Sequence, residues 1–271
     1  MKNRILIGTI WALTCLTGCQ SDEDMGSAGN ENLADRVIRV TAKVNEEMHT
    51  RAGLTSDNLK DLCLVITDKE NNTCRYNEQM VSDDNGGWMT YNGNLLLWNL
   101  EKSPVEVLAF APYQKTDLKE PLTVDVCTDQ TGQAAIEASD FLLHTPATVN
   151  PSQSSSLVLS FNHAMSRLQV RVMMGGETKE ITNLTINGVL TKATCDLASK
   201  NPVVVAGGEL GRVSLYRIET NFFECILPPQ VCEEGVVITF NSAGRGYKWT
   251  STETVTLQAG VNQVWTIDPK E

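Results

Sequence analysis

Short runs of alternating apolar and polar residues recur along most of the chain after residue 36. Ile38, Val40, Ala42 and Val44 alternate with polar residues, which is the period-two pattern of a strand with one buried face. Similar strand patterns occur at 62–67, 105–110, 122–126, 157–161, 168–172, 236–240 and 264–267. No stretch keeps a helical period over about twelve residues. The sequence therefore predicts an all-β protein built of β-sandwiches.

Turn-forming residues separate these strands, and one segment divides them into two groups. Asp, Asn and Gly cluster at 83–87, and similar turn chemistry occurs at 129–132, 187–188 and 242–244. The segment 151–156 reads Pro-Ser-Gln-Ser-Ser-Ser and has strand patterns on both sides. We therefore expect an N-terminal sandwich at 37–150, a linker at 151–156 and a C-terminal sandwich at 157–271.

The N-terminus has the composition of an export signal. A short basic start precedes an apolar run at 5–16, which is too short to span a bilayer. The run ends in Leu-Thr-Gly-Cys, which resembles a bacterial lipobox. This resemblance implies a signal peptide at 1–18, cleavage between Gly18 and Cys19, and a covalent lipid such as palmitate on Cys19. An ordinary secretory signal with an incidental cysteine is the alternative.

The residues after Cys19 predict a tether. Three acids at 22–24 are followed by a stretch rich in Gly, Ser, Asn and Glu, so 19–36 has too little apolar surface to fold. The acidic start also resembles the surface-export signal of lipoproteins in Bacteroides-type bacteria. It implies a surface-exposed outer-membrane lipoprotein. A solvated tether without export meaning is the alternative.

Charge and cysteine content limit the classes of partner and cofactor. The net charge is −11, and no Lys/Arg-rich cluster is present to pair with phosphates, so nucleic acid is not an expected partner. Six cysteines follow the tether, without a C-x-x-C pair: Cys63, Cys74, Cys127, Cys195, Cys225 and Cys232. They are either disulfide-bonded, with Cys225–Cys232 the best-placed pair, or buried thiols. No metal-ligand spacing is visible, and we expect no cofactor besides the lipid.

No catalytic signature is visible either. The sequence lacks G-x-S-x-G, H-E-x-x-H, Walker and dinucleotide-binding motifs, so we expect no enzymatic activity. His163, Ser166 and Arg167 match no nucleophile arrangement, and we interpret them as a polar entry to a strand. The acidic turn at 83–86 is a hairpin turn or an incomplete calcium loop, and the hairpin is favoured.

Three aromatic residues have two alternative interpretations. Trp88, Tyr91 and Trp98 are either a sugar-stacking platform or core and cross-strand residues. A platform would favour a glycan-binding surface lipoprotein of a polysaccharide-uptake system.

The order of several motifs resembles the fimbrillin family of Bacteroides and Porphyromonas fimbriae. After the lipobox and the strand at 37–44 comes His-Thr-Arg-Ala-Gly at 49–53. Further matching segments lie at 62–67, around Trp88, and at 105–113, 159–168 and 257–267. The resemblance covers most of the chain in order and pattern, without one decisive motif.

The resemblance implies two transthyretin-like Greek-key β-sandwiches in tandem and a structural, adhesive role in fimbriae. It implies that an arginine-specific protease cuts between Arg51 and Ala52 and that the strand 37–44 is then removable. Other fimbrial subunits would be partners by donor-strand exchange, and the outer membrane would be a partner through the lipid. The position of the subunit in the fimbria stays open: shaft, tip, accessory or anchor.

Overall fold

Strands form almost all of the regular structure. The computed structural model describes residues 33–45, 53–83, 85–151, 156–251 and 253–269. Its two helices are short: α1 (Leu33–Arg36) and α2 (Gln133–Ser139). No helix in the described ranges is both long and apolar enough to cross a membrane. The all-β prediction is confirmed.

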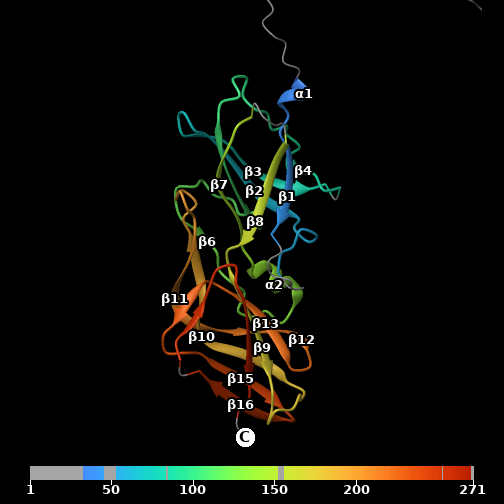
Figure 1. Cartoon of the computed structure of the whole chain (residues 1–271), viewed down its shortest axis with the longest axis vertical. Coiled ribbons are helices and arrows are strands. Elements are labelled where there is room, and N and C mark those ends of the chain that lie inside the picture. The colour runs from blue at the N-terminus through green and yellow to red at the C-terminus, as the bar shows by residue number, and fades with distance from the viewer. Residues whose placement is uncertain (1–32, 46–52, 84, 152–155, 252, 270–271) are drawn as a thin grey trace, which may run out of the picture.

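The upper half of the molecule in Figure 1 is one closed sheet. Its strands are β1 (Arg39–Val44), β2 (Asp61–Asp68), β3 (Thr73–Ser82), β4 (Trp88–Thr90), β5 (Val105–Ala111), β7 (Leu142–Val149) and β8 (Ser156–His163). They lie in the order β1-β4-β3-β2-β5-β7-β8, and the sheet closes because β8 pairs with β1. This closing pair is parallel, whereas the other pairs in the sheet are antiparallel.

The lower half contains two larger sheets around a second core. One sheet has the order β11-β10-β15-β16, with β6 also paired to β10, and the other has the order β12-β13-β9-β18. Their strands are β6 (Leu122–Thr123), β10 (Thr182–Cys195), β11 (Val204–Ser214), β15 (Val237–Ser242), β16 (Arg245–Thr250), β9 (Ser166–Val172), β12 (Tyr216–Glu219), β13 (Phe222–Leu227) and β18 (Asn262–Ile267). A short pair, β14 (Gln230–Cys232) with β17 (Val255–Leu257), completes this half.

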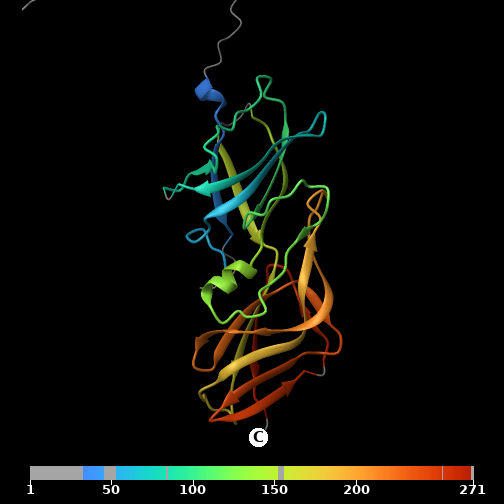
Figure 2. The ribbon, with the colours of Figure 1, turned by 180° about the vertical axis from the view of Figure 1, so that it is seen from behind.

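Strands β2 and β5 of the closed sheet contribute side chains to the cores of both halves. Along β2, Leu62, Leu64 and Ile66 face the core of the closed sheet, whereas Cys63 and Val65 face the second core. Both faces of β2 are thus buried, which explains its continuous apolar sequence. Ile136 of α2 is also fully buried in the second core, and Figure 2 shows α2 between the halves.

The predicted division of the chain differs from the observed sheets at two strands. The sequence assigned 122–126 to the N-terminal sandwich, but β6 pairs with β10 in the second half. The sequence assigned 157–161 to the C-terminal sandwich, but β8 lies in the closed sheet between β7 and β1. The segment 151–156 accordingly follows β7 and leads into β8 of the same sheet. The chain enters the second half first with β6, returns to the closed sheet with β7, and passes finally into the second half at 164–165, between β8 and β9. Proline and serine mark a surface connection, but they do not specify which sheet the next strand joins.

Candidate strand-exchange site

Strand β1 has very different contacts along its two edges. On one edge, β8 pairs with it over the whole strand, from Arg39 opposite Ser156 to Val44 opposite Phe161. On the other edge, β4 contributes a single pair, Val40 opposite Trp88. β1 therefore has a complete ladder on one side. On the other side, the single pair with β4 is continued before the strand by a bridge between Val37 and Leu97, where the Ile38 N–H donates to the Leu96 carbonyl at 2.9 Å.

The apolar side chains of β1, and of Ile38 just before it, fill part of the closed sheet's core. Ile38, Val40 and Val44 are buried, with 6%, 2% and 5% exposure, and Ala42 is half-buried against the same cluster. Neighbours in this cluster include Met80, Trp98, Leu157, Leu159 and Phe161. Burying an aliphatic side chain contributes about 1.5–3 kcal/mol. Loss of β1 would leave this apolar surface without cover.

A cleft of about 690 Å³ lies beside the short contact between β1 and β4. Val40 lines it from β1, together with Ile38 just before that strand, and Trp88 lines it from β4. Met89 and Leu95, which also line it, are 52% and 62% exposed. The weakly paired edge of β1 thus borders an open space with apolar walls.

Polar contacts tie both ends of β1 in place. Before the strand, Arg36 Nε and Nη2 donate to the Trp98 carbonyl at 3.0 and 2.8 Å. After it, the Asn45 N–H donates to the Phe161 carbonyl at 2.8 Å, and Asn45 Nδ2 donates to Asn162 Oδ1 at 2.7 Å. Arg36 is half-buried and occupied by these contacts.

The segment that begins at Gly53 accepts a hydrogen bond from β1, from the Val44 N–H to Ser56 Oγ at 3.0 Å, and it also has contacts that do not involve β1. The Leu54 N–H donates to Asp140 Oδ2 at 2.9 Å, and Asn58 Nδ2 donates to the Gly53 carbonyl at 3.0 Å. Gly53 has φ +99°, and a Cβ there would lie 2.9 Å from Asp140 Oδ2, so both conformation and space require glycine.

Asp140 also anchors His163, at the end of β8. His163 Nδ1 lies 2.8 Å from Asp140 Oδ2, and the Asp140 side chain is 1% exposed. Burial would lower the pKa of His163, but the hydrogen bond and the charge of Asp140 raise it overall. The predicted polar entry at His163 is thus half of a buried pair. No sequence motif marked Asp140, because its burial depends on the packing of distant segments.

The C-terminal strand occupies a comparable position in the second half. β18 lies at the edge of its sheet and pairs in parallel with β9, from Asn262 opposite Arg167 to Ile267 opposite Val172. Just beyond it, the Asp268 carboxylate accepts the N–H groups of Gly175 and Gly176 at 2.8 and 3.0 Å. β1 therefore runs parallel to β8, and β18 runs parallel to the next strand in the chain, β9.

A family model described as fimbrillin-like matches residues 50–271, which is most of the chain. The chain belongs to the fimbrillin-like family. Among curated proteins, none matches this sequence.

Solved structures show the same fold as this fimbrillin-like protein. A candidate cell adhesion protein of Bacteroides ovatus has a TM-score of 0.70 and 16% identity, over 86% of this chain and 92% of that one. One from Bacteroides uniformis has a TM-score of 0.67 and 16% identity, over 89% and 95%. The tip fimbrial protein Mfa3 of Porphyromonas gingivalis, with a C-terminal truncation, has a TM-score of 0.52 and 10% identity, over 86% of this chain and 95% of that one. At these identities the likeness establishes the fold.

Several predicted positions of the fimbrillin-like chain lie outside the described residues. These are the lipobox residues Gly18 and Cys19 and the cleavage residues Arg51 and Ala52. Their roles stay predictions.

Of the two alternatives for Trp88, Tyr91 and Trp98, the sugar-stacking platform is wrong for this fimbrillin-like fold. Trp98 is 1% exposed and belongs to the core, Trp88 is half-buried against it, and Tyr91 is 72% exposed. A shared flat surface of the three rings is therefore ruled out. The predicted hairpin turn is present, and Asp83 Oδ1 accepts the N–H groups of Asn85 and Gly87, both at 2.8 Å.

The cysteines that follow the tether are free thiols. Cys63, Cys195, Cys225 and Cys232 are buried, Cys127 is half-buried and Cys74 is exposed. Of the two alternatives for these cysteines, the structure has the unbridged thiols, including Cys225 and Cys232.

Proposed function

We propose that this fimbrillin-like protein is a structural and adhesive subunit of cell-surface fimbriae, without enzymatic activity, that assembles by donor-strand exchange. The observation that carries the proposal is the position of β1. It fills an apolar core, has a full ladder on one edge only, and precedes the predicted cleavage bond in the chain. We take the two halves as the tandem transthyretin-like sandwiches that the family resemblance implies.

The proposed maturation begins at the membrane. The protein is exported as a lipoprotein on Cys19 and reaches the outer face of the outer membrane. An arginine-specific protease then cuts the Arg51–Ala52 bond. The cut leaves β1 bound by non-covalent contacts alone, whereas the chain from Gly53 onward stays docked through Asp140 and Asn58.

Release of β1 creates the acceptor site. The edge of β8 loses its ladder, and Leu157, Leu159 and Phe161 lose their apolar cover. Unpaired strand edges and apolar grooves bind added strands well, because backbone hydrogen bonds and side-chain burial are recovered together. A strand from another subunit would fill the groove. Until cleavage, β1 would block this reaction and prevent premature polymerisation.

The test is cleavage of the purified full chain by an arginine-specific protease. We expect a new N-terminus at Ala52, followed by high-mass polymers on a denaturing gel run without heating. Arg51→Ala should retain lipidation, measured by palmitate labelling, but give neither product. Arg39→Ala is the matched control, because Arg39 is an exposed arginine on β1 itself. Normal assembly of Arg51→Ala, or cleaved chains that stay monomeric, would refute the proposal.

A further inference from the structure

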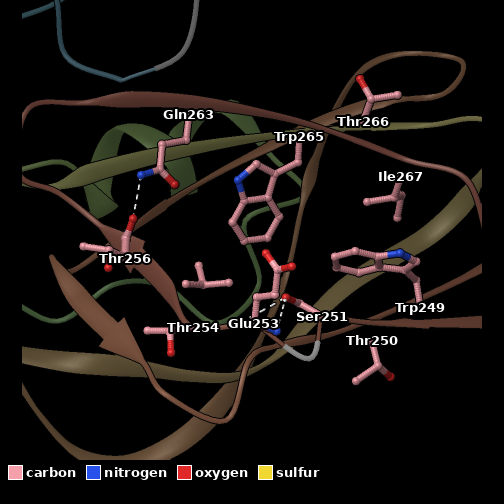
Figure 3. A pocket seen from close by; sticks show the side chains of 11 residues that line it. Trp249, Thr250, Ser251, Glu253, Thr254, Thr256, Gln263, Trp265, Thr266 and Ile267 are labelled. Carbon is pink, nitrogen blue, oxygen red and sulfur yellow. Dashed lines mark hydrogen bonds between the residues drawn. The ribbon is translucent and has the colours of Figure 1, made fainter.

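A second cavity lies far from β1, in the C-terminal half. It has a volume of about 610 Å³ and opens between the edge strands β16 and β18, with β17 along its border. Figure 1 places β16 at the end of the molecule opposite α1, and Figure 3 shows the cavity from close by. Access to this cavity does not require removal of β1.

Two tryptophans from different strands form its apolar wall. Trp249 lies near the end of β16, and Trp265 lies on β18. Both indoles are half-buried and pack against the C-terminal core, so the core holds them while part of each ring stays accessible. On β16, Tyr247 stacks on Phe240 at 5.4 Å, which fixes the inward-facing row that Trp249 continues. The indoles are thus supported from behind and open toward the cavity (Figure 3).

The same cavity presents polar groups suited to hydroxyl ligands. The Glu253 side chain lines the same cavity as the two indoles and lies between them in the view of Figure 3. Within the described ranges its carboxylate has no hydrogen-bond or ion-pair partner. Ser251 Oγ positions the Glu253 backbone, with contacts of 3.3 Å to its N–H and 3.2 Å to its carbonyl. Gln263 Nε2 donates to the Thr256 carbonyl at 2.6 Å, which leaves Oε1 free to accept.

We propose that this cavity binds a saccharide unit. The C–H face of a pyranose carries slight positive charge and suits the negative face of an indole. The ring hydroxyls would donate to Glu253 and to Gln263 Oε1, and would pair with the hydroxyl of Thr254 at the rim. The volume lies in the range of about 300–1,000 Å³ that is usual for small-ligand sites. A cation could also use two indoles and a carboxylate, but it would leave the hydroxyl and amide groups unused.

This site differs from the sugar-stacking platform that was one alternative for Trp88, Tyr91 and Trp98, because another pair of rings forms it. Sugar binding at Trp249 and Trp265 would give the subunit an adhesive function of its own. It does not depend on cleavage at Arg51 or on strand exchange. Its test can therefore fail while the assembly proposal stands, and the reverse also holds.

The test is saturation-transfer NMR of the uncleaved full chain with named probes. The probes are methyl glycosides of glucose, galactose, mannose and fucose, together with N-acetylglucosamine, N-acetylgalactosamine and tetramethylammonium chloride. We expect saturable transfer to at least one sugar. Trp265→Ala and Trp249→Ala should each weaken binding about tenfold. Tyr91→Ala, which removes an exposed aromatic ring in the other half, should leave it unchanged.

Two milder variants separate a lost contact from lost folding. Trp265→Phe keeps an apolar ring against the core, and Glu253→Gln changes an exposed side chain, so both should fold normally. Both should still weaken sugar binding measurably. Absence of saturable transfer from every sugar overturns the proposal. It is also overturned by sugar transfer that survives all four pocket substitutions, or by saturable binding of tetramethylammonium alone.

Discussion

Val40→Ala measures how strongly β1 is held in the closed sheet. Val40 is 2% exposed within the core cluster, so the substitution removes two methyl groups from a buried site. At about 0.8 kcal/mol per buried methylene-sized group, the transfer contribution is about 1.6 kcal/mol. A residual cavity adds to this cost, so we expect a loss of about 2 kcal/mol in the free energy of unfolding of the intact chain.

The same contact should control the release of β1 after cleavage. A loss of about 2 kcal/mol corresponds to about a 30-fold weaker retention of the cut segment. Urea unfolding of the intact protein gives the first quantity, since a shift in midpoint at constant slope reports stability. Mass spectrometry of the peptide released with time after protease treatment gives the second.

Thr41→Ala is the matched control, because Thr41 is an exposed neighbour on the same strand. Exposed substitutions of this kind usually stay within about 0.5 kcal/mol. If Val40→Ala and Thr41→Ala unfold at the same urea concentration, β1 does not hold its place by core packing. If both release the segment at the wild-type rate, the proposed non-covalent retention of β1 is wrong.

Two further predictions concern buried titratable groups. The folded pKa of His163 is raised overall, so the Asp140 pair stabilises the fold fully below the unfolded pKa, and this contribution is lost as pH rises through the folded pKa. Asp140→Asn should lower the pKa of His163, measured by NMR titration. It should also reduce the difference in stability between about pH 5 and about pH 8, measured by thermal unfolding. An unchanged His163 titration would contradict the pairing. Burial raises the pKa of Cys63 to about 12, with smaller contributions from Cys74 and Glu78, whereas Cys74 is exposed. Iodoacetamide should therefore label Cys74 in the native protein and Cys63 only after unfolding, and peptide mass mapping that finds Cys63 labelled first would refute its burial.

The predicted strands illustrate why a sequence pattern can identify a strand without identifying the core or the strand that it packs against. The alternation at 38–44 predicted a half-buried strand, and β1 has that form because one face contacts the core and the other faces solvent. At 62–67 the sequence is apolar throughout, and only the packed structure shows that β2 divides its side chains between two cores. The segment 122–126 is a strand at Leu122–Thr123, while Val124 and Val126 still donate to backbone carbonyls of β10.

The candidate sites depended on tertiary contacts to different degrees. The burial of Ile38, Val40 and Val44 followed from local periodicity, since alternation assigns side chains to faces. The Asp140–His163 pair did not, because its partners are 23 residues apart and meet only through the packing of loops. The cavity at Trp249 and Trp265 also required the structure, because two separate strands supply its rings.

The sequence by itself determined the all-β class, the apolar face of the first strand and the resemblance to fimbrillins, because these depend on local periodicity and motif order. Tertiary structure decided that β8 joins the first sheet, that Trp98 is buried, and that β1 has one strong and one weak edge. Strand pairing joins residues distant in the chain, and many partners satisfy the same backbone hydrogen bonds. Only the packing of the whole chain selects among them.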